Sequence, residues 1–293
     1  MAYRNHIKSL LLQHAGFSPS VAEKKAEEYT GKEEMKLFEE AITHSSIDPN
    51  NNYDLLELYG DTKLNEFASE YIRLVRPEVV NIQWLDKLRH YLQSREIFMK
   101  FTFTLGLDKF LLIDRTNPVI KSIFDNKTGA EQRRYEKLMG DVSEAFFQAL
   151  FMVARRHSTG VGVAYQVCYN FAMKLFQATV GDLPLDYGLY FDAKTLLKET
   201  VERAPHNWIE KGNINSIKRT IVHSNGVTEV SFVGFINGRT NPPVVIGTAT
   251  DFNAHKAEQK AALDALKTIE NTKYLNMSIN IPDYKSRTVK PLR

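Results

Sequence analysis

The chain has 293 residues, of which 43% are hydrophobic, 25% are charged and one is cysteine, with a formal net charge of +3. This length allows one large domain or two ordinary ones, and the single cysteine excludes a disulfide framework. No apolar run reaches the length of a membrane span, and the N-terminus does not read as a signal peptide. We therefore expect an intracellular protein in a reducing compartment (cytoplasm, organelle or host cytoplasm) with no membrane partner.

The first 180 residues show helical patterning and no sustained alternation of apolar and polar residues. We therefore predict an all-α domain over residues 1–180. Its helices are expected at 7–12, 18–30, 32–42, 54–75, 82–105 (as one helix or two), 108–113, 130–156 and 163–178. The polar stretch 114–128 is interpreted as a loop or a mobile insertion.

The pattern changes after residue 190. Residues 181–191, with Pro184 and Gly188, are interpreted as a linker. A helix at 193–204, alternating strands at 214–223, 227–237 and 243–249, and a helix at 253–269 are then expected. The order α-β-β-β-α predicts a small α+β domain over residues 192–272, followed by a basic tail at 273–293.

The charges of the two parts differ. Residues 1–189 carry 23 Lys and Arg against 25 Asp and Glu, whereas residues 190–293 carry 15 against 10. An acidic first part and a basic second part are compatible with metal chemistry in the first and a polyanionic partner for the second. The asymmetry is weak support by itself, because many proteins with neither function have one.

Two predicted helices carry acids at helical spacing. Asp54, Glu57 and Asp61 are three and four residues apart, and Asp141 and Glu144 are three apart, so each set shares a helix face. Apolar residues surround both sets, and acids in an apolar helix are unfavourable unless something compensates them. A hard divalent cation takes carboxylate oxygens, so the pattern predicts a metal site. For Asp54, capping of the helix N-terminus is an equally good interpretation.

Four short motifs follow one another along the chain. They are Thr-His-Ser-Ser at 43–46, Leu-Glu-Leu-Tyr-Gly-Asp at 56–61, Thr-Leu-Gly-Leu at 104–107 and Gly-Asp-Val-Ser-Glu-Ala at 140–145. In this order they resemble the ribonuclease III family, whose signature core is Leu-Glu-Phe-Leu-Gly-Asp. The α-β-β-β-α part is similar to the double-stranded-RNA-binding domain that often follows in that family. The resemblance covers about residues 30–270, and ordered motifs are far more specific than one pattern alone.

The resemblance implies an endonuclease that hydrolyses phosphodiester bonds in double-stranded RNA with Mg²⁺, for which Mn²⁺ substitutes. The family's four metal-site carboxylates fall on Glu57, Asp61, Asp141 and Glu144. An auxiliary catalytic acid falls on Asp54. The family acts as a homodimer in which each subunit cuts one strand. Its interface phenylalanine falls on Leu58, so we expect that position at the dimer interface, with less buried area.

The RNA-binding signature of the second domain is partly present. Thr195 and Glu199 match the family's first RNA-contact helix. The Lys-Lys pair that usually opens the last helix is replaced by an alanine and His255, followed by Lys256 and Lys260. We expect these five residues to contact RNA, but weakly and with a shallow salt dependence, because fewer lysines release fewer counterions.

A non-cleaving relative of the same family is the alternative interpretation. Such a protein would bind duplex RNA to shield it, or would be a structural component of a ribonucleoprotein. All four metal-site carboxylates are present, which favours the enzyme, because a protein that does not cleave has no need of them. The reduced RNA-binding signature favours the alternative.

Overall fold

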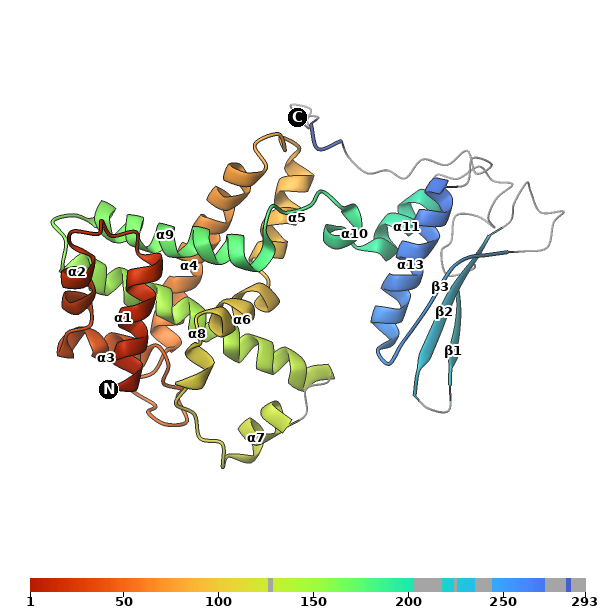
Figure 1. The fold of residues 1–293 in the computed structure, drawn as a ribbon. Helices are drawn as coiled ribbons and strands as arrows, with labels where there is room; N and C mark the ends of the chain where they lie inside the picture. The colour runs from red at the N-terminus through yellow and green to blue at the C-terminus, as the bar shows by residue number, and fades with distance from the viewer. Residues whose placement is uncertain (126–128, 203–217, 224–225, 235–243, 272–282, 286–293) are drawn as a thin grey trace, which may run out of the picture. The chain divides into compact units, whose positions relative to one another are not determined.

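The computed structural model describes residues 1–125, 129–202, 218–223, 226–234, 244–271 and 283–285. The chain divides into two compact units, Met1–Leu183 and Pro184–Arg293. The described part of the first unit is helical, and the second contains a three-stranded antiparallel sheet with helices (Figure 1). These findings confirm the predicted class, an all-α domain followed by a small α+β domain.

The first unit is arranged around one long central helix. Its elements are α1 (Ala2–His14), α2 (Ala22–Tyr29), α3 (Lys32–Glu40), α4 (Asp54–Val75), α5 (Ile82–Leu92), α6 (Arg95–Thr104), the 3₁₀ helix η1 (Leu107–Lys109), α7 (Pro118–Asp125), α8 (Gly129–Arg156) and α9 (Val161–Val180). Helix α8 packs against α3, α4, α6, α7 and α9 (Figure 1). Most of its residues from Tyr135 to Ala154 are buried, as expected for a helix that is covered on all sides.

Two predictions of local structure are wrong. The stretch 114–128 is not a loop throughout, because Pro118–Asp125 form α7. The Asn117 side chain accepts a hydrogen bond from the Val119 amide, and proline is favoured in the first helical turn, so Asn-Pro starts a helix here. The helix expected at 108–113 is limited to η1. Leu112 instead forms an isolated parallel bridge with Thr43.

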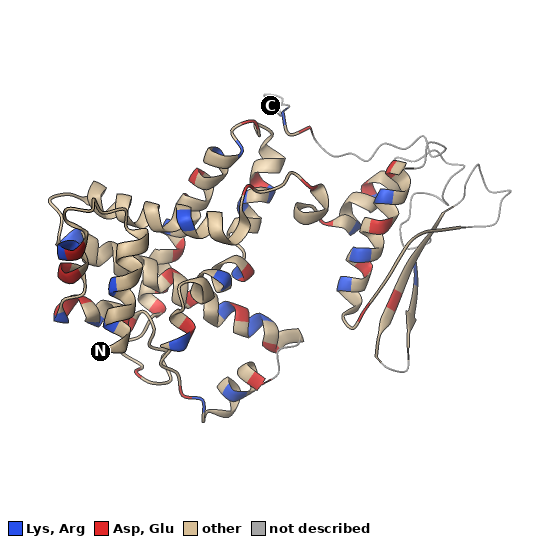
Figure 2. Ribbon diagram, viewed as in Figure 1, with Lys and Arg blue, Asp and Glu red and all other residues tan. Residues whose placement is uncertain are grey.

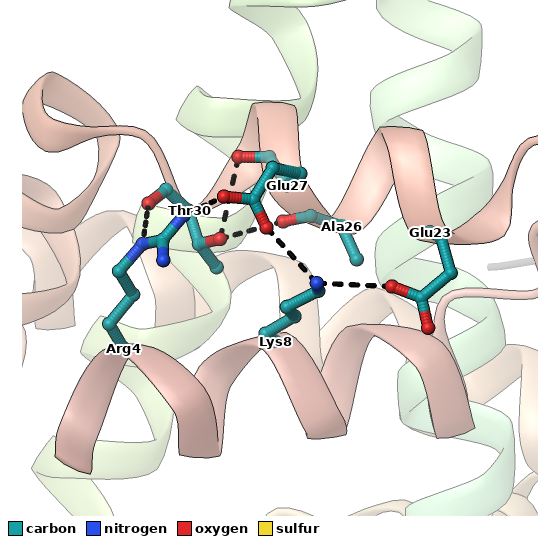
Figure 3. A network of polar contacts seen from close by, with 6 residues as sticks. All are labelled: Arg4, Lys8, Glu23, Ala26, Glu27 and Thr30. Atoms are coloured by element: carbon teal, nitrogen blue, oxygen red, sulfur yellow. Dashed lines mark hydrogen bonds and ion pairs between the residues drawn. The ribbon is translucent and has the colours of Figure 1, made fainter. Parts of the chain in front are cut away.

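An ion-pair network joins α1 to α2 (Figure 3). The Lys8 ammonium lies 3.0 Å from carboxylate oxygens of both Glu23 and Glu27, and Arg4 binds Glu27 and the Thr30 carbonyl. Exposed ion pairs contribute little to stability. We therefore attribute the position of α1 to its buried apolar face, which consists of Ile7, Leu10 and Leu11.

The second unit contains α10 (Tyr187–Tyr190), α11 (Ala193–Glu202), β1 (Lys218–Val222), β2 (Thr228–Gly234), β3 (Val244–Asp251) and α13 (Ala254–Asn271). The sheet order is β1-β2-β3, both pairs are antiparallel, and a bulge lies between Phe232 and Val233. Val230, Phe232 and Ile246 pack with α11 and α13 in a core of its own.

The predicted linker 181–191 contains the boundary between the units and the short helix α10. The predicted tail 273–293 lies outside the described residues except at 283–285. The functional division into domains stays a prediction. None of the helices in the described ranges combines the length and the apolar character needed to cross a membrane.

Helices α4 and α8 cross at Gly60. A Cβ atom built at Gly60 would lie 1.8 Å from the main-chain oxygen of Glu144, so the two backbones touch where no side chain fits. Glu57 and Asp61 lie on either side of Gly60 along α4. The crossing therefore brings acids from two distant parts of the sequence to one place.

We expect Gly60→Ala to reduce the free energy of unfolding by about 3 kcal/mol or more, because a methyl group would separate the two central helices. Gly140→Ala is the matched control on α8. Its Cβ would meet the Phe98 Cβ at 3.5 Å, an ordinary contact, and alanine favours helix over glycine. Urea unfolding of both variants measures the difference. Equal stability of the two would contradict the close crossing.

Candidate metal centre

Three carboxylates converge where α4 meets α8. Glu57, Asp141 and Glu144 place carboxylate oxygens within 4.8 Å of one another, and we call them the carboxylate triad. Glu57 comes from α4, and the other two lie one turn apart on α8. No second group of three or more Asp, Glu, His or Cys side chains this close together occurs in the part of the chain that the structure describes.

The triad is partly buried and its charges repel one another; the Glu57 side chain is 30% exposed. Glu144 is 8% exposed, and the Asp141 side chain is 13% exposed. Burial, with the charges of Asp141, Asp61 and Glu57, raises the pKa of Glu144 to about 8. Burial also raises the pKa of Asp141 and of Glu57. A divalent cation fits this donor set, because it would offset the repulsion that the three carboxylates create.

Lys137 binds two members of the triad. Its Nζ lies 2.7 and 2.9 Å from the carboxylate oxygens of Asp141 and 3.8 Å from Glu57 Oε1. Burial lowers the pKa of Lys137, but the hydrogen bond to Asp141 and the surrounding carboxylates raise it above its ordinary value. The ammonium group thus supplies positive charge where the triad needs it. Sequence reasoning missed Lys137, although its four-residue spacing from Asp141 was a usable signal.

Asp61 lies outside the triad. Its Oδ1 accepts a hydrogen bond of 3.0 Å from Asn65 Nδ2, one turn further along α4. Its charge still raises the pKa of both Glu57 and Glu144, so the carboxylate is a near neighbour of the cluster. Three of the four predicted metal ligands are therefore gathered, and the fourth lies beside them.

Asp54 is the first residue of α4 and is exposed. Tyr53 precedes it at the capping position, and its side chain makes no capping hydrogen bond. Asp54 instead donates its amide to Asn52 Oδ1 at 3.0 Å. Its charge contributes to the raised pKa of Asp141, but its carboxylate is not part of the triad. The structure thus gives Asp54 no capping role and leaves its catalytic role a prediction.

Leu58 lies on an uncovered part of α4. Its side chain is 61% exposed, and the large apolar side chains of Leu55 and Tyr59 are exposed as well. These three residues share one helix face, which we call the α4 apolar face. Contiguous exposed apolar surface of this kind marks interaction sites.

The predicted RNA-contact residues lie on two helices that pack together, α11 and α13. Asp192 links the N-terminal parts of α11 and α13, because its carboxylate accepts hydrogen bonds from the Thr195 amide and the Gln259 side chain. Thr195, His255 and Lys256 are exposed. Glu199 is partly exposed on the second turn of α11.

Several lysines of the second unit are already paired with acids. Lys260 Nζ lies 2.8 Å from Asp251 Oδ2. Glu258, which is largely buried, holds Lys194 at 3.0 Å and Lys218 at 2.7 Å. Acidic and basic residues alternate along α13 (Figure 2). This pairing reduces the positive charge that the unit offers to an anionic partner.

Glu144 should make the metal-free protein less stable at higher pH. Because its folded pKa is raised from 4.5 to about 8, the folded chain binds the proton more tightly than the unfolded chain does. Stability therefore falls as pH rises across this interval. We expect the free energy of unfolding of Glu144→Gln to exceed that of the wild type by about 2 kcal/mol at pH 8 in the presence of a chelator, and to match it near pH 5. Urea unfolding at the two pH values measures this, and a wild type that is the more stable at pH 8 would contradict it.

No protein-family model matches the chain. A protein of Invertebrate iridescent virus 6 assigned as ribonuclease 3 is 24% identical over 249 residues, covering 82% of this chain and 80% of the relative. A protein of Frog virus 3 (isolate Goorha) with the same assignment is 27% identical over 169 residues, covering 57% and 42%. Ribonuclease 3 of Aquifex aeolicus (strain VF5) is 25% identical over 244 residues, covering 83% and 94%.

Among solved structures, the nuclease domain of ribonuclease III from Campylobacter jejuni aligns with 50% of this chain and 88% of its own, at 21% identity and a TM-score of 0.38. A score this low supports no conclusion about a shared fold. The resemblance is carried by the ordered motifs, the carboxylates that they bring together, and the relatives aligned over most of the chain. The chain is therefore similar in sequence to members of the ribonuclease III family.

Proposed function

We propose that the chain is an endonuclease that hydrolyses phosphodiester bonds in double-stranded RNA with a divalent cation. The observation that carries this proposal is the partly buried carboxylate triad at the crossing of α4 and α8. The names of the relatives support the substrate, since they are ribonucleases of type 3 aligned over most of this chain.

Mg²⁺ suits the triad, because it takes oxygen ligands and keeps several of its waters, and Mn²⁺ accepts the same ligands. When bound, such a cation lowers the pKa of a coordinated water and polarises the scissile phosphate. The triad holds the cation in this proposal, with Asp61 beside it. Lys137, once its carboxylate partners are neutralised, is placed to attract the phosphate.

The alternative, a duplex-RNA-binding relative that does not cleave, is favoured by the acid-paired lysines of the second unit. It does not account for the triad, because a protein that only binds RNA gains nothing from three partly buried carboxylates that repel one another. We therefore prefer the enzyme. In this proposal the second unit binds duplex RNA weakly, and its affinity depends only slightly on salt concentration.

We propose a homodimer that associates through the α4 apolar face. One active site can cut one strand, so cleavage of both strands at one place needs two sites. Leu58 at the centre of this face replaces the larger residue of the family, and its exposure leaves apolar area to be buried by a second copy.

Glu144→Gln should lower cleavage of long duplex RNA in Mg²⁺ by roughly a thousandfold or more, because it removes one charge from the site while keeping the side-chain shape. RNA binding should persist. Glu136→Gln is the control on the same helix, since Glu136 bonds Gln132 and lies outside the triad. A gel assay measures both, and full activity of Glu144→Gln would remove the basis of the proposed site.

Leu58→Arg should shift the protein from dimer to monomer, because a charged side chain would have to be buried at the interface. Leu74→Arg is the matched control, since both leucines lie on α4 and each is 61% exposed. Light scattering at micromolar concentration reports the mass. The interface is wrong if Leu58→Arg stays dimeric, or if the wild type is monomeric while cutting both strands.

A further inference from the structure

Asn65 is the hydrogen-bond partner of Asp61, the predicted metal ligand that lies outside the triad. Its Nδ2 donates to Asp61 Oδ1 at 3.0 Å. A carboxylate can only accept hydrogen bonds, so the amide must present its nitrogen to Asp61. The orientation of the Asn65 side chain is therefore fixed by chemistry as well as by geometry.

The two oxygen atoms of Asn65 take no part in this bond to Asp61. Its carbonyl oxygen accepts hydrogen bonds from Ser69 Oγ at 3.2 Å and from Gln93 Nε2 at 3.4 Å. Its side-chain Oδ1 is buried and accepts no hydrogen bond from the described residues. A buried amide oxygen without a donor is unfavourable. The side chain thus keeps the bond to Asp61 although its own oxygen is left unsatisfied.

We propose that Asn65 is a positioning residue of the metal centre, which holds the Asp61 carboxylate beside the triad and prevents it from joining the cluster. This inference rests on the proposed function. A fourth carboxylate inside the triad would add repulsion, whereas one held at its edge stays available to a bound cation. Hydrogen-bonded partners of ligating carboxylates orient them in this way, and their loss typically weakens metal binding or activity by about 10- to 100-fold.

A simpler account is that Asn65 and Asp61 form an ordinary pair on one helix face, which affects helix stability alone. The two accounts differ in what they predict for metal binding. If the two side chains only stabilise the helix, a folded Asn65 variant should bind the metal with unchanged affinity. A positioning role predicts weaker binding that depends on the presence of Asp61.

The test is a Mn²⁺ titration of the full chain without RNA, followed by the paramagnetic resonance signal of free Mn²⁺. Asn65→Ala and Asn65→Leu should each raise the dissociation constant about tenfold. The leucine variant keeps the side-chain volume if the alanine variant folds poorly. Ser69→Ala, on the same helix face, should bind as the wild type. Asn65→Ala should add nothing in an Asp61→Ala background, because both changes remove the same function.

Glu144→Gln separates failure of this inference from failure of the proposed function. If Glu144→Gln loses Mn²⁺ while folded Asn65 variants bind as the wild type, the role of Asn65 is wrong and the metal centre stands. If Glu144→Gln binds as the wild type, the proposed metal centre itself is wrong. Additive effects of Asn65→Ala and Asp61→Ala would also overturn the positioning role, since Asn65 would then act independently of Asp61.

Discussion

The backbone contact between α4 and α8 at Gly60 is the constraint on which the candidate site depends. Because the main chain of Glu144 lies where a side chain at Gly60 would be, the two helices meet more closely than any side chain at position 60 would allow. That approach brings the Glu57 carboxylate to those of Asp141 and Glu144, of which Glu144 is buried. The same contact that makes the fold compact therefore creates a cluster of like charges.

The chain compensates this cluster in two ways. Lys137 brings an ammonium group to Asp141 and Glu57, and Asn65 holds Asp61 at the edge of the cluster. Neither compensation is complete, because the pKa values of all three triad residues remain raised. Real proteins tend to break local rules at functional sites, and incomplete compensation of this kind is consistent with the metal centre that we propose.

The sequence predicted the elements that carry the site better than it predicted the site's final arrangement. Helix α4 has the bounds expected from its apolar spacing and the Arg-Pro that follows it. Helical spacing shows which acids share a face. It does not show that Asp61 lies outside the triad, because that depends on the hydrogen bond to the Asn65 amide. It also does not show that Lys137 reaches the triad, because that depends on the conformation of the lysine side chain. The Lys260–Asp251 pair was likewise missed, because it joins the end of a strand to a helix. The catalytic and RNA-binding roles stay predictions.

The central claim is that the carboxylate triad binds a divalent cation, and anomalous diffraction from crystals soaked in Mn²⁺ tests it most directly. We expect one strong anomalous peak bounded by Glu57, Asp141 and Glu144, with the Lys137 ammonium displaced from Asp141. A protein that cuts duplex RNA with Mn²⁺ but shows no peak there, or shows it elsewhere, would contradict the claim.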